Sequence, residues 1–237
     1  NPLAMRRDRG ISPQMIMEHI NAQFPHSIYV TDVGQHQMWA TQYLELDEQS
    51  QLITSGGLGT MGFGFPAAIG AKIANPKKPV VCITGDGGFQ MNIQEMQTIL
   101  QNRLPVKLFV INNQGYHSIR QTQQSYFKPP LVGVGEESGD LSFPDLSRIM
   151  PAYGFPYRAV HASEDLEAAI SEVLDAEGAF VCEVFVTKYQ KTEPKTSAKK
   201  LPDGSMVSAP LEDMYPFLDR EELESNMFIP LPEKMRQ

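Results

Sequence analysis

Hydrophobic positions along the chain follow two alternating patterns. Short unbroken runs of apolar and β-branched residues, such as "PVVCIT" and "PVKLFVIN", predict strands that are buried on both faces. Between such runs, apolar residues recur every three or four positions, as Ile93, Met96 and Leu100 do, which predicts amphipathic helices. Strands that alternate with helices predict a parallel sheet joined by right-handed crossovers.

The fold class that follows is α/β, with a central parallel sheet of about six strands flanked by helices. Ser12 followed by Pro13 is typical of a helix start, and Ser163 is expected to cap the last helix. The expected strands are 27–33, 51–55, 79–84, 105–112, 157–160 and 179–186, and the expected helices are 12–24, 64–74, 92–102, 145–153 and 163–176.

The character of the chain changes near residue 187. The segment "TKYQKTEPKTSAKKLPDGS" is polar, rich in lysine and poor in strand patterns, and its lysines predict a solvated basic loop. We therefore expect residues 1–187 to form the main domain. Residues 188–237 are expected to form an extension that docks on this domain or on a partner.

Composition excludes several classes of function. The net charge of −8 argues against a nucleic-acid partner, and no apolar run approaches the roughly 18 residues of a membrane span. The first residues lack the apolar segment of a secretory signal. Cys82 and Cys182 lie in apolar runs and predict buried thiols in a reducing compartment, without the cysteine pairs of zinc or iron–sulfur sites. The expected location is cytoplasmic.

Segments rich in glycine and amide side chains follow four of the predicted strands. They read "DVGQHQMW", "SGGLGTMGFG", "GDGG" and "NNQG". In a parallel α/β sheet, ligands bind beyond the carboxyl ends of the strands. Glycine permits close approach of the backbone, and helix N-termini offer free N–H groups to an anion. Four such loops at one edge predict a cradle of the size of a phosphate group.

Asp86 lies among these glycines, where a bare diphosphate would be repelled. A diphosphate that carries Mg²⁺ would instead be attracted, because this cation takes oxygen ligands from carboxylates, amides, backbone carbonyls and phosphates. Asn113 follows the next buried strand and offers an amide oxygen. We interpret Asp86 and Asn113 as two protein ligands of one Mg²⁺. Taken singly, a helix cap at Asp86 and a turn at Asn113 remain the simpler interpretations.

A dinucleotide site is the competing interpretation. The segment "GLGTMG" (residues 57–62) fits G-x-G-x-x-G between a strand and a helix. That fingerprint also requires an acidic residue about 20 positions further on, at a strand end. Asp86 is roughly in this place, but its flanking glycines and the partner Asn113 favour the metal interpretation.

The spaced motif "GDG", 24 residues, "NN" resembles the signature of thiamine diphosphate enzymes, in the domain that binds the diphosphate. The segments "GQHQMWATQ" and "ITSGGLGTMGFGFPAAIGA" are similar to those of acetohydroxyacid synthase (acetolactate synthase) catalytic subunits. The resemblance is continuous from about Ile28 to Asn113 and looser to about Val186. It implies thiamine diphosphate and Mg²⁺ as cofactors, and it leaves FAD open for the full-length enzyme.

The resemblance also implies roles for individual residues. Mg²⁺ would be held by Asp86, Asn113 and the backbone carbonyl of Gly115. The diphosphate would be contacted by Gln35, His36, Gly87 and Gly88. A structural role for His36 remains the alternative, and His117, just beyond Asn113, is left open as a residue on the substrate side.

Met61 and Gly59 carry the catalytic roles that the resemblance implies. Met61 would wedge the cofactor into a bent shape, which brings the cofactor's own amine to its thiazolium C2–H, and the backbone of Gly59 would hold that amine. An apolar wedge can do this without competing hydrogen bonds, and a site of low dielectric favours the ylid. An ordinary core methionine is the alternative for Met61.

Complete members of the family have a pyrimidine-binding, a central and a diphosphate-binding domain, and this sequence resembles only the last. The glutamate that protonates the aminopyrimidine comes from the first domain, usually of a facing subunit. We therefore expect the chain to be inactive alone. Its expected partners are the missing domains, in one polypeptide or in a partner subunit, within a homodimer or homotetramer.

The implied activity is decarboxylation of a 2-keto acid such as pyruvate, followed by transfer of the enamine to a second carbonyl compound. Two positions depart from the synthases: Ser118 stands where they have methionine, and Thr122 where they have tryptophan. These departures leave open a more polar acceptor, such as a hydroxylated carbonyl compound, and they also leave open simple decarboxylation. A simple 2-keto acid decarboxylase and a non-catalytic cofactor-binding subunit remain as alternatives.

Overall fold

The computed structural model describes residues 10–127, 129–188, 190, 192–200 and 204–230. The chain divides into two compact units. One comprises Arg6–Gln190, and the other comprises Lys191–Gln237 together with Asn1–Met5. The docking role expected for residues 188–237 remains a prediction.

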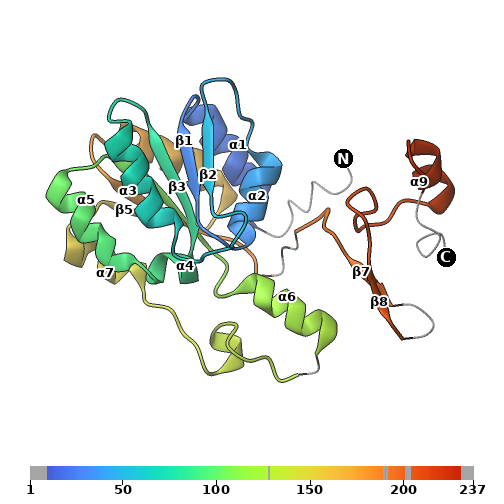
Figure 1. Ribbon diagram of the computed structural model, residues 1–237. Coiled ribbons are helices and arrows are strands. Elements are labelled where there is room, and N and C mark those ends of the chain that lie inside the picture. The colour runs from blue at the N-terminus through green and yellow to red at the C-terminus, as the bar shows by residue number, and fades with distance from the viewer. Residues whose placement is uncertain (1–9, 128, 189, 191, 201–203, 231–237) are drawn as a thin grey trace. The chain divides into compact units, whose positions relative to one another are not determined.

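The larger unit is built on a six-stranded sheet in which every pair of neighbouring strands is parallel (Figure 1). The strand order is β2-β1-β3-β4-β6-β5. The bounds are β1 (Ile28–Thr31), β2 (Gln51–Thr54), β3 (Val80–Gly85), β4 (Val106–Asn112), β5 (Tyr157–Val160) and β6 (Phe180–Phe185). The predicted fold class and all six predicted strands are confirmed.

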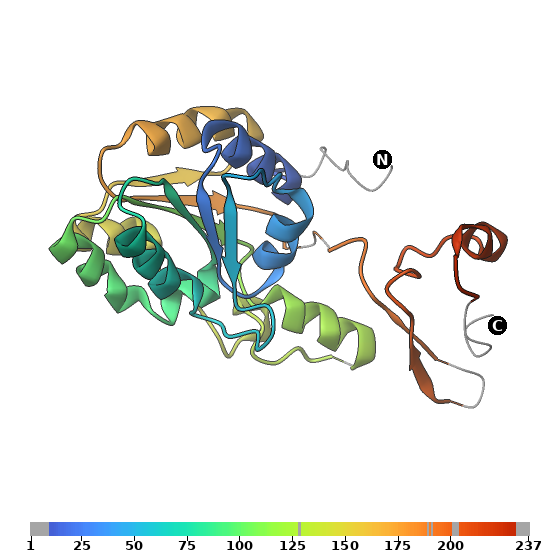
Figure 2. The same cartoon turned by 45° about the horizontal axis from the view of Figure 1, so that its top comes forward.

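Helices cover both faces of the sheet (Figure 2). Helices α1, α2 and α8 pack on one face, and α3, α5 and α7 pack on the other. The bounds are α1 (Pro13–Gln23), α2 (Gln35–Tyr43), α3 (Gly64–Ala74), α4 (Asp86–Gln90), α5 (Met96–Asn102), α6 (His117–Tyr126), α7 (Leu146–Tyr153) and α8 (Leu166–Asp175), with 3₁₀ turns at Ile93–Glu95, Glu136–Ser138 and Ser163–Asp165.

Strand β3 shows why helices pack on both faces of the sheet and form three layers. All six of its residues are buried. Val81 and Ile83 join the cluster under α1, α2 and α8, while Val80 and Cys82 join the cluster under α3, α5 and α7. Successive side chains of a strand point to opposite faces, so an unbroken apolar run fills both cores. Each such side chain contributes about 1.5–3 kcal/mol of transfer free energy.

Two helix starts test the capping predictions. Ser12 caps α1 as expected, since its hydroxyl accepts the Met15 N–H at 3.2 Å. The expected cap at Ser163 is wrong. Ser163 is the first residue of a 3₁₀ turn, Ala162 occupies the cap position, and α8 begins only at Leu166. The Ser163 hydroxyl therefore lies one position too late to cap.

The smaller unit contains a hairpin of β7 (Ala198–Lys200) and β8 (Met206–Ser208) and the helix α9 (Arg220–Asn226). The sequence patterns did not predict these two short strands. The buried Asp213 accepts hydrogen bonds from both terminal nitrogens of Arg220, each at 2.8 Å, which fixes the segment before α9.

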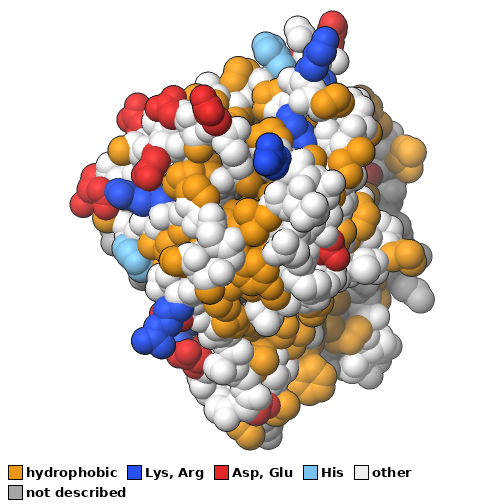
Figure 3. All heavy atoms as spheres, turned by 90° about the vertical axis from the view of Figure 1, so that its left-hand side faces the viewer, with side chains coloured by type: hydrophobic (Ala, Val, Ile, Leu, Met, Phe, Trp, Pro, Cys, Tyr) orange, Lys and Arg blue, Asp and Glu red, His pale blue; other side chains and the backbone are white. Residues whose placement is uncertain are grey.

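The surface of the molecule is mixed in character. The face in Figure 3 carries hydrophobic side chains along its middle, and acidic and basic side chains occur together mainly at its left side and top. Apolar atoms make up more than about half of the surface of ordinary folded proteins, so these hydrophobic side chains alone do not define a binding surface. Within the described residues, every helix is too short or too polar to cross a membrane.

Candidate cofactor site

The site lies where the strand order reverses. After β1 the chain adds β2 on one side, then crosses to the other side of β1 to form β3 and β4. The connections that leave the carboxyl ends of β1 and β3 therefore diverge and leave a crevice between them. This position is where open α/β sheets bind ligands.

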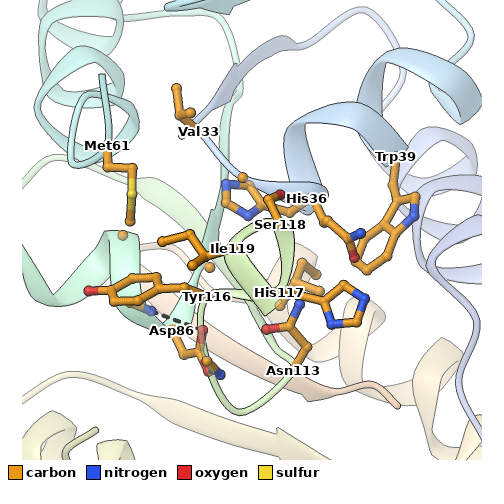
Figure 4. A pocket seen from close by; sticks show the side chains of 17 residues that line it. Val33, His36, Trp39, Met61, Asp86, Asn113, Tyr116, His117, Ser118 and Ile119 are labelled. Atoms are coloured by element: carbon orange, nitrogen blue, oxygen red, sulfur yellow. Dashed lines mark hydrogen bonds between the residues drawn. The ribbon is translucent and has the colours of Figure 1, made fainter. Parts of the chain in front are cut away.

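A pocket occupies this crevice (Figure 4). Its walls come from the segments that follow β1, β3 and β4 and from the loop between β2 and α3. Of the nine residues predicted for the site, eight line the pocket: Gln35, His36, Met61, Asp86, Gly87, Gly88, Asn113 and Gly115. Gly59 is exposed in the same loop as Met61 and is not among the lining residues. The roles of these nine residues remain predictions.

Asp86 is the first residue of α4 and directly follows β3. Its side chain is buried, and its two carboxylate oxygens accept the backbone N–H groups of Gly87 and Gly115, each at 2.9 Å. Burial raises the pKa of Asp86 to about 7, and the charge of Glu183 adds to this, while the two N–H groups and Arg120 oppose it. The ion pairs among the described residues do not include Asp86, and a buried carboxylate of this kind is suited to hold a cation.

The loop after β4 is shaped by glycine. Gly115 has φ +140°, and a Cβ atom there would lie 2.0 Å from the Val134 carbonyl oxygen. That same oxygen accepts the Tyr116 N–H at 2.8 Å, so the neighbouring chain cannot move away without losing this bond. Glycine is thus required at the position whose N–H reaches Asp86. Asn113, two residues earlier, is buried beside it.

The two glycines after Asp86 are also required by close contacts. A Cβ atom on Gly87 would lie 2.2 Å from the Tyr116 ring, and one on Gly88 would lie 2.1 Å from Asp32 Oδ2. Real Cβ contacts do not come this close, so larger residues would displace α4 from the end of β3. The backbone at this corner is therefore held close to the pocket wall.

Gln35 and His36 lie in the first turn of α2, with Gly34 as the N-cap. The expectation that "DVGQHQMW" is a loop is therefore wrong, because a helix begins at Gln35, directly after this glycine. Both side chains are buried. Burial lowers the pKa of His36 to about 4, against the opposing charge of Asp32, so its imidazole is neutral at neutral pH.

Several buried polar atoms at the pocket have no hydrogen-bond partner among the described residues. They include Gln35 Oε1, His36 Nε2 and Ser118 Oγ. Gln35 is held from its other side, since its Nε2 donates to Gln121 Oε1 at 2.9 Å. A buried polar atom left unpaired costs about 1–3 kcal/mol. Their concentration at one pocket indicates a ligand with polar groups.

The segment after Asn113 forms the remaining wall. Helix α6 begins at His117, and Ser118 and Ile119 line the pocket. His117 is buried, and its Nδ1 lies 2.9 Å from Nη1 of Arg120. Burial, with the Arg120 charge, lowers the pKa of His117 to about 4. Thr122 is exposed on α6 and is not among the lining residues.

Sequence patterns missed two buried charges that support the site. Asp32, at the end of β1, accepts the Gly64 N–H at 3.4 Å and the Thr84 hydroxyl at 3.2 Å, and so joins the ends of β1 and β3 to the start of α3. Arg120 is 1% exposed, pairs with Glu137 and donates to the Gln114 carbonyl at 2.9 Å. An acid directly after a strand could have indicated Asp32, whereas Arg120 lies on a helix that the patterns did not predict.

The donor set fits a hard cation better than a transition metal. In the part of the chain that the structure describes, no group of three or more histidine, cysteine, aspartate or glutamate side chains is placed to hold a metal ion. Mg²⁺ does not need such a cluster, because it is commonly bound through one or two carboxylates together with the oxygens of a phosphate ligand. Asp86, Asn113 and the Gly115 carbonyl provide carboxylate, amide and backbone oxygens.

Comparison with known proteins agrees with this site. Residues 32–184 match the family model for the C-terminal TPP-binding domain of thiamine pyrophosphate enzymes. The chain is 39% identical over 200 residues to the acetolactate synthase large subunit of Cyanidium caldarium, covering 84% of this chain and 34% of the relative. It is 37% identical over 207 residues to the isozyme 2 large subunit of Escherichia coli (87% and 36%) and 41% identical over 172 residues to acetolactate synthase 1 of Nicotiana tabacum (71% and 26%).

These matches cover about a third of the length of the relatives, or less. They give no support to the dinucleotide interpretation of residues 57–62, because the matched family is one that binds thiamine pyrophosphate. The match includes strands β3 and β4 and the segment that directly follows β1, from which most of the pocket is built. This chain therefore belongs to the family of C-terminal thiamine pyrophosphate-binding domains of thiamine pyrophosphate enzymes.

Proposed function

We propose that the pocket binds the diphosphate of thiamine diphosphate together with Mg²⁺. The observation that supports this most directly is the hydrogen bond from the Gly115 N–H to Asp86, since it joins the two halves of the predicted metal site. Asp86, Asn113 and the Gly115 carbonyl would hold the cation. Its charge would offset the cost of burying the Asp86 carboxylate.

The diphosphate would lie against the remaining polar wall. Gly87 and Gly88 keep the backbone close to the pocket, and the first turn of α2 offers N–H groups that have no partner within the helix. His36 is neutral, so its unpartnered Nε2 can donate a hydrogen bond when it carries the ring proton. Gln35 can turn its amide to donate in the same way.

Met61 would support the organic part of the cofactor. In Figure 4 its thioether lies across the pocket from Trp39 and comes from the loop between β2 and α3. When bound, thiamine diphosphate supplies a nucleophilic thiazolium carbon and takes up the electrons released by decarboxylation. A side chain that packs without offering hydrogen bonds can fix the cofactor's shape, with Gly59 holding the amine from the same loop.

The whole protein would act as an acetolactate synthase-like enzyme. It would decarboxylate a 2-keto acid such as pyruvate and transfer the remaining two-carbon unit to a second carbonyl compound. The pyrimidine-binding and central domains, from the same polypeptide or a partner subunit, would complete the site in a homodimer or homotetramer. Whether the whole protein binds FAD would then depend on those domains. Buried free thiols at Cys82 and Cys182 suit a reducing compartment such as the cytoplasm.

The wall at Ser118 would face the acceptor, and a serine there would make it more polar than the methionine that the synthases have at this position. Ser118 lines the pocket with an unpartnered hydroxyl, which a hydroxylated acceptor could satisfy. The comparisons favour neither the decarboxylase nor the non-catalytic alternative. Product analysis of the assembled enzyme with pyruvate separates transfer, which yields acetolactate, from simple decarboxylation, which yields acetaldehyde.

Calorimetric titration of this chain with thiamine diphosphate tests the cofactor assignment. We expect binding that requires Mg²⁺ and that weakens at least 10-fold in Asp86→Ala, while NADH gives no heat. Equal binding to the wild type and the variant, or binding that ignores Mg²⁺, would refute the metal site. If the chain alone binds nothing, repeating the titration with the pyrimidine-binding domain added distinguishes an incomplete site from a wrong one.

A further inference from the structure

Glu183 is a buried carboxylate that the proposed cofactor site does not use. It lies in the middle of β6 and is 3% exposed. Both of its oxygens accept hydrogen bonds: Oε1 from the Asn112 amide at 2.7 Å, and Oε2 from the Tyr157 hydroxyl. The ion pairs among the described residues do not include Glu183. A buried charge without a cation is costly, so its position needs a reason.

The strands place these three side chains on one face of the sheet. Glu183 pairs in register with Val110 of β4 and with Ala159 of β5. Val110 and Val181 belong to the cluster under α3, α5 and α7, and residues two apart on a strand share a face. Asn112 and Glu183 therefore point to that same face, near the carboxyl edge of the sheet. The loop of residues 113–115, here called the metal loop because it carries two of the proposed Mg²⁺ ligands, begins at this edge.

Glu183 fixes the orientation of the Asn112 amide. A carboxylate only accepts hydrogen bonds, so Asn112 must present Nδ2 to it. The other amide atom, Oδ1, then faces the following turn, where it accepts the Gln114 N–H at 2.9 Å. This bond closes a turn across Asn113 and supports the positive φ of Gln114, +59°.

The loop is held at its far end as well. The Gln114 carbonyl accepts from Arg120, and the Gly115 N–H donates to Asp86. Residues 113–115, which carry the Asn113 amide and the Gly115 carbonyl, are thus fixed between Asn112 on one side and Asp86 on the other. Freeing Asn112 would release one of these two anchors.

We propose that Glu183 is a positioning residue for the metal loop, acting through Asn112 without touching the ion. The inference rests on the proposed Mg²⁺ site and assigns a role to the first asparagine of the "NN" pair. Groups that orient metal ligands typically change metal affinity by 10–100-fold when removed. A bond that only ties β4 to β6 would change stability and leave metal affinity unaltered.

Four variants of the full chain separate these roles. Glu183→Met keeps the volume and loses the link, and Asn112→Ala loses the bond to Gln114. Glu183→Gln removes the charge but can still accept from Asn112 and donate to Tyr157. Tyr157→Phe removes one hydrogen bond of Glu183 and leaves the Asn112 link intact, so it is the control for a purely structural effect.

The first measurement is Mn²⁺ binding, followed by electron paramagnetic resonance of free Mn²⁺ at a fixed excess of thiamine diphosphate. We expect affinity to fall about 10-fold or more in Glu183→Met and Asn112→Ala and to stay within about threefold in Glu183→Gln and Tyr157→Phe. The double variant Glu183→Met, Asn112→Ala should be no weaker than Asn112→Ala alone. A wild-type affinity in Glu183→Met would overturn the inference while leaving the metal site intact.

The second measurement needs no cofactor. Hydrogen exchange of the Gln114 and Gly115 amides in the free chain should speed up at least 10-fold in Glu183→Met relative to Tyr157→Phe, with core amides of β3 unchanged. Unchanged exchange at both amides would overturn the positioning role even if the metal site is real. If the wild type fails to bind Mn²⁺ with the pyrimidine-binding domain present, the proposed function fails and the inference falls with it.

Discussion

Several residues at this site lower the stability of the folded chain. Asp86 is a buried carboxylate, and burial favours its neutral form, yet the proposed role as a metal ligand requires the ionised form. The glycines around it give up side chains so that the backbone can approach closely. Natural proteins keep such unfavourable features where they serve function, so the same residues should respond in opposite ways when stability and binding are measured.

Replacing Asp86 by asparagine should stabilise the metal-free chain at pH 8. The pKa of Asp86 is raised to about 7 in the folded state, so the stability that its protonated form contributes is complete below pH 4 and is lost as the pH rises through 7. Asparagine stays neutral throughout. Urea unfolding should show a gain of about 1–3 kcal/mol at pH 8 that shrinks towards pH 5.

The matched control for this variant is Asp145→Asn. Asp145 is an exposed N-cap whose role asparagine fills equally well, so little change is expected at either pH. A loss of stability in Asp86→Asn at pH 8 would show that the carboxylate is needed for the fold itself. In the same samples, Mg²⁺-dependent binding of thiamine diphosphate should disappear.

Gly88→Ala should cost about 1–3 kcal/mol of unfolding free energy. Its Cβ would meet Asp32 Oδ2 at 2.1 Å, and Asp32 is fixed by Gly64 and Thr84. Gly70→Ala is the control, because this exposed position in α3 has open space and should gain about 0.5–1 kcal/mol. The measurement is the thermal unfolding temperature of the two variants. A shift in the same direction in both would show that the corner at Gly88 is not closely packed.

The elements show what sequence patterns can and cannot predict. Strands β3 and β4 were predictable because unbroken apolar runs have few alternatives in an α/β chain. Helix α2, "QHQMWATQY", and helix α6, "HSIRQTQQSY", were not, because their few apolar residues give little helical period. The residues proposed to hold the metal and the diphosphate lie in spaced motifs that the sequence displays. The contacts of Glu183 and Arg120 join distant segments, so only the fold reveals them.

The stability of helix α6 should depend on the buried side chain of Arg120. Arg120 pairs with Glu137, contacts His117 and donates to the Gln114 carbonyl, so it ties α6 to the metal loop. Arg120→Met would remove the donor to the Gln114 carbonyl and leave Glu137 with Lys188 as its remaining partner, so it should cost about 2–4 kcal/mol in chemical unfolding. Glu137→Gln should cost less, since Glu137 is partly exposed. Equal costs for the two variants would show that the stability comes from the ion pair with Glu137 and not from the hydrogen bond to the Gln114 carbonyl.

At the scale of the whole molecule, large apolar side chains stand exposed around the site. Leu58, in the loop that carries Met61, is 93% exposed, and Ile119 beside the pocket is 44% exposed. Exposed apolar residues of this size next to a binding site commonly mark a surface that another domain covers. The matched relatives are about three times as long as the matched region, and we expect a further domain of the kind proposed above to cover these side chains.

Leu58→Asp should therefore block assembly and leave the isolated chain's own cofactor site intact. The test titrates thiamine diphosphate and Mg²⁺ with and without the remaining domains of a relative such as the Escherichia coli subunit. We expect those domains to tighten binding at least 10-fold for the wild type and to have no effect on Leu58→Asp, because a charge at the covered surface would be desolvated without a partner. Ile73→Asp, at the far end of α3, is the control and should behave like the wild type. Equal tightening in Leu58→Asp would show that the covering domain contacts the chain elsewhere.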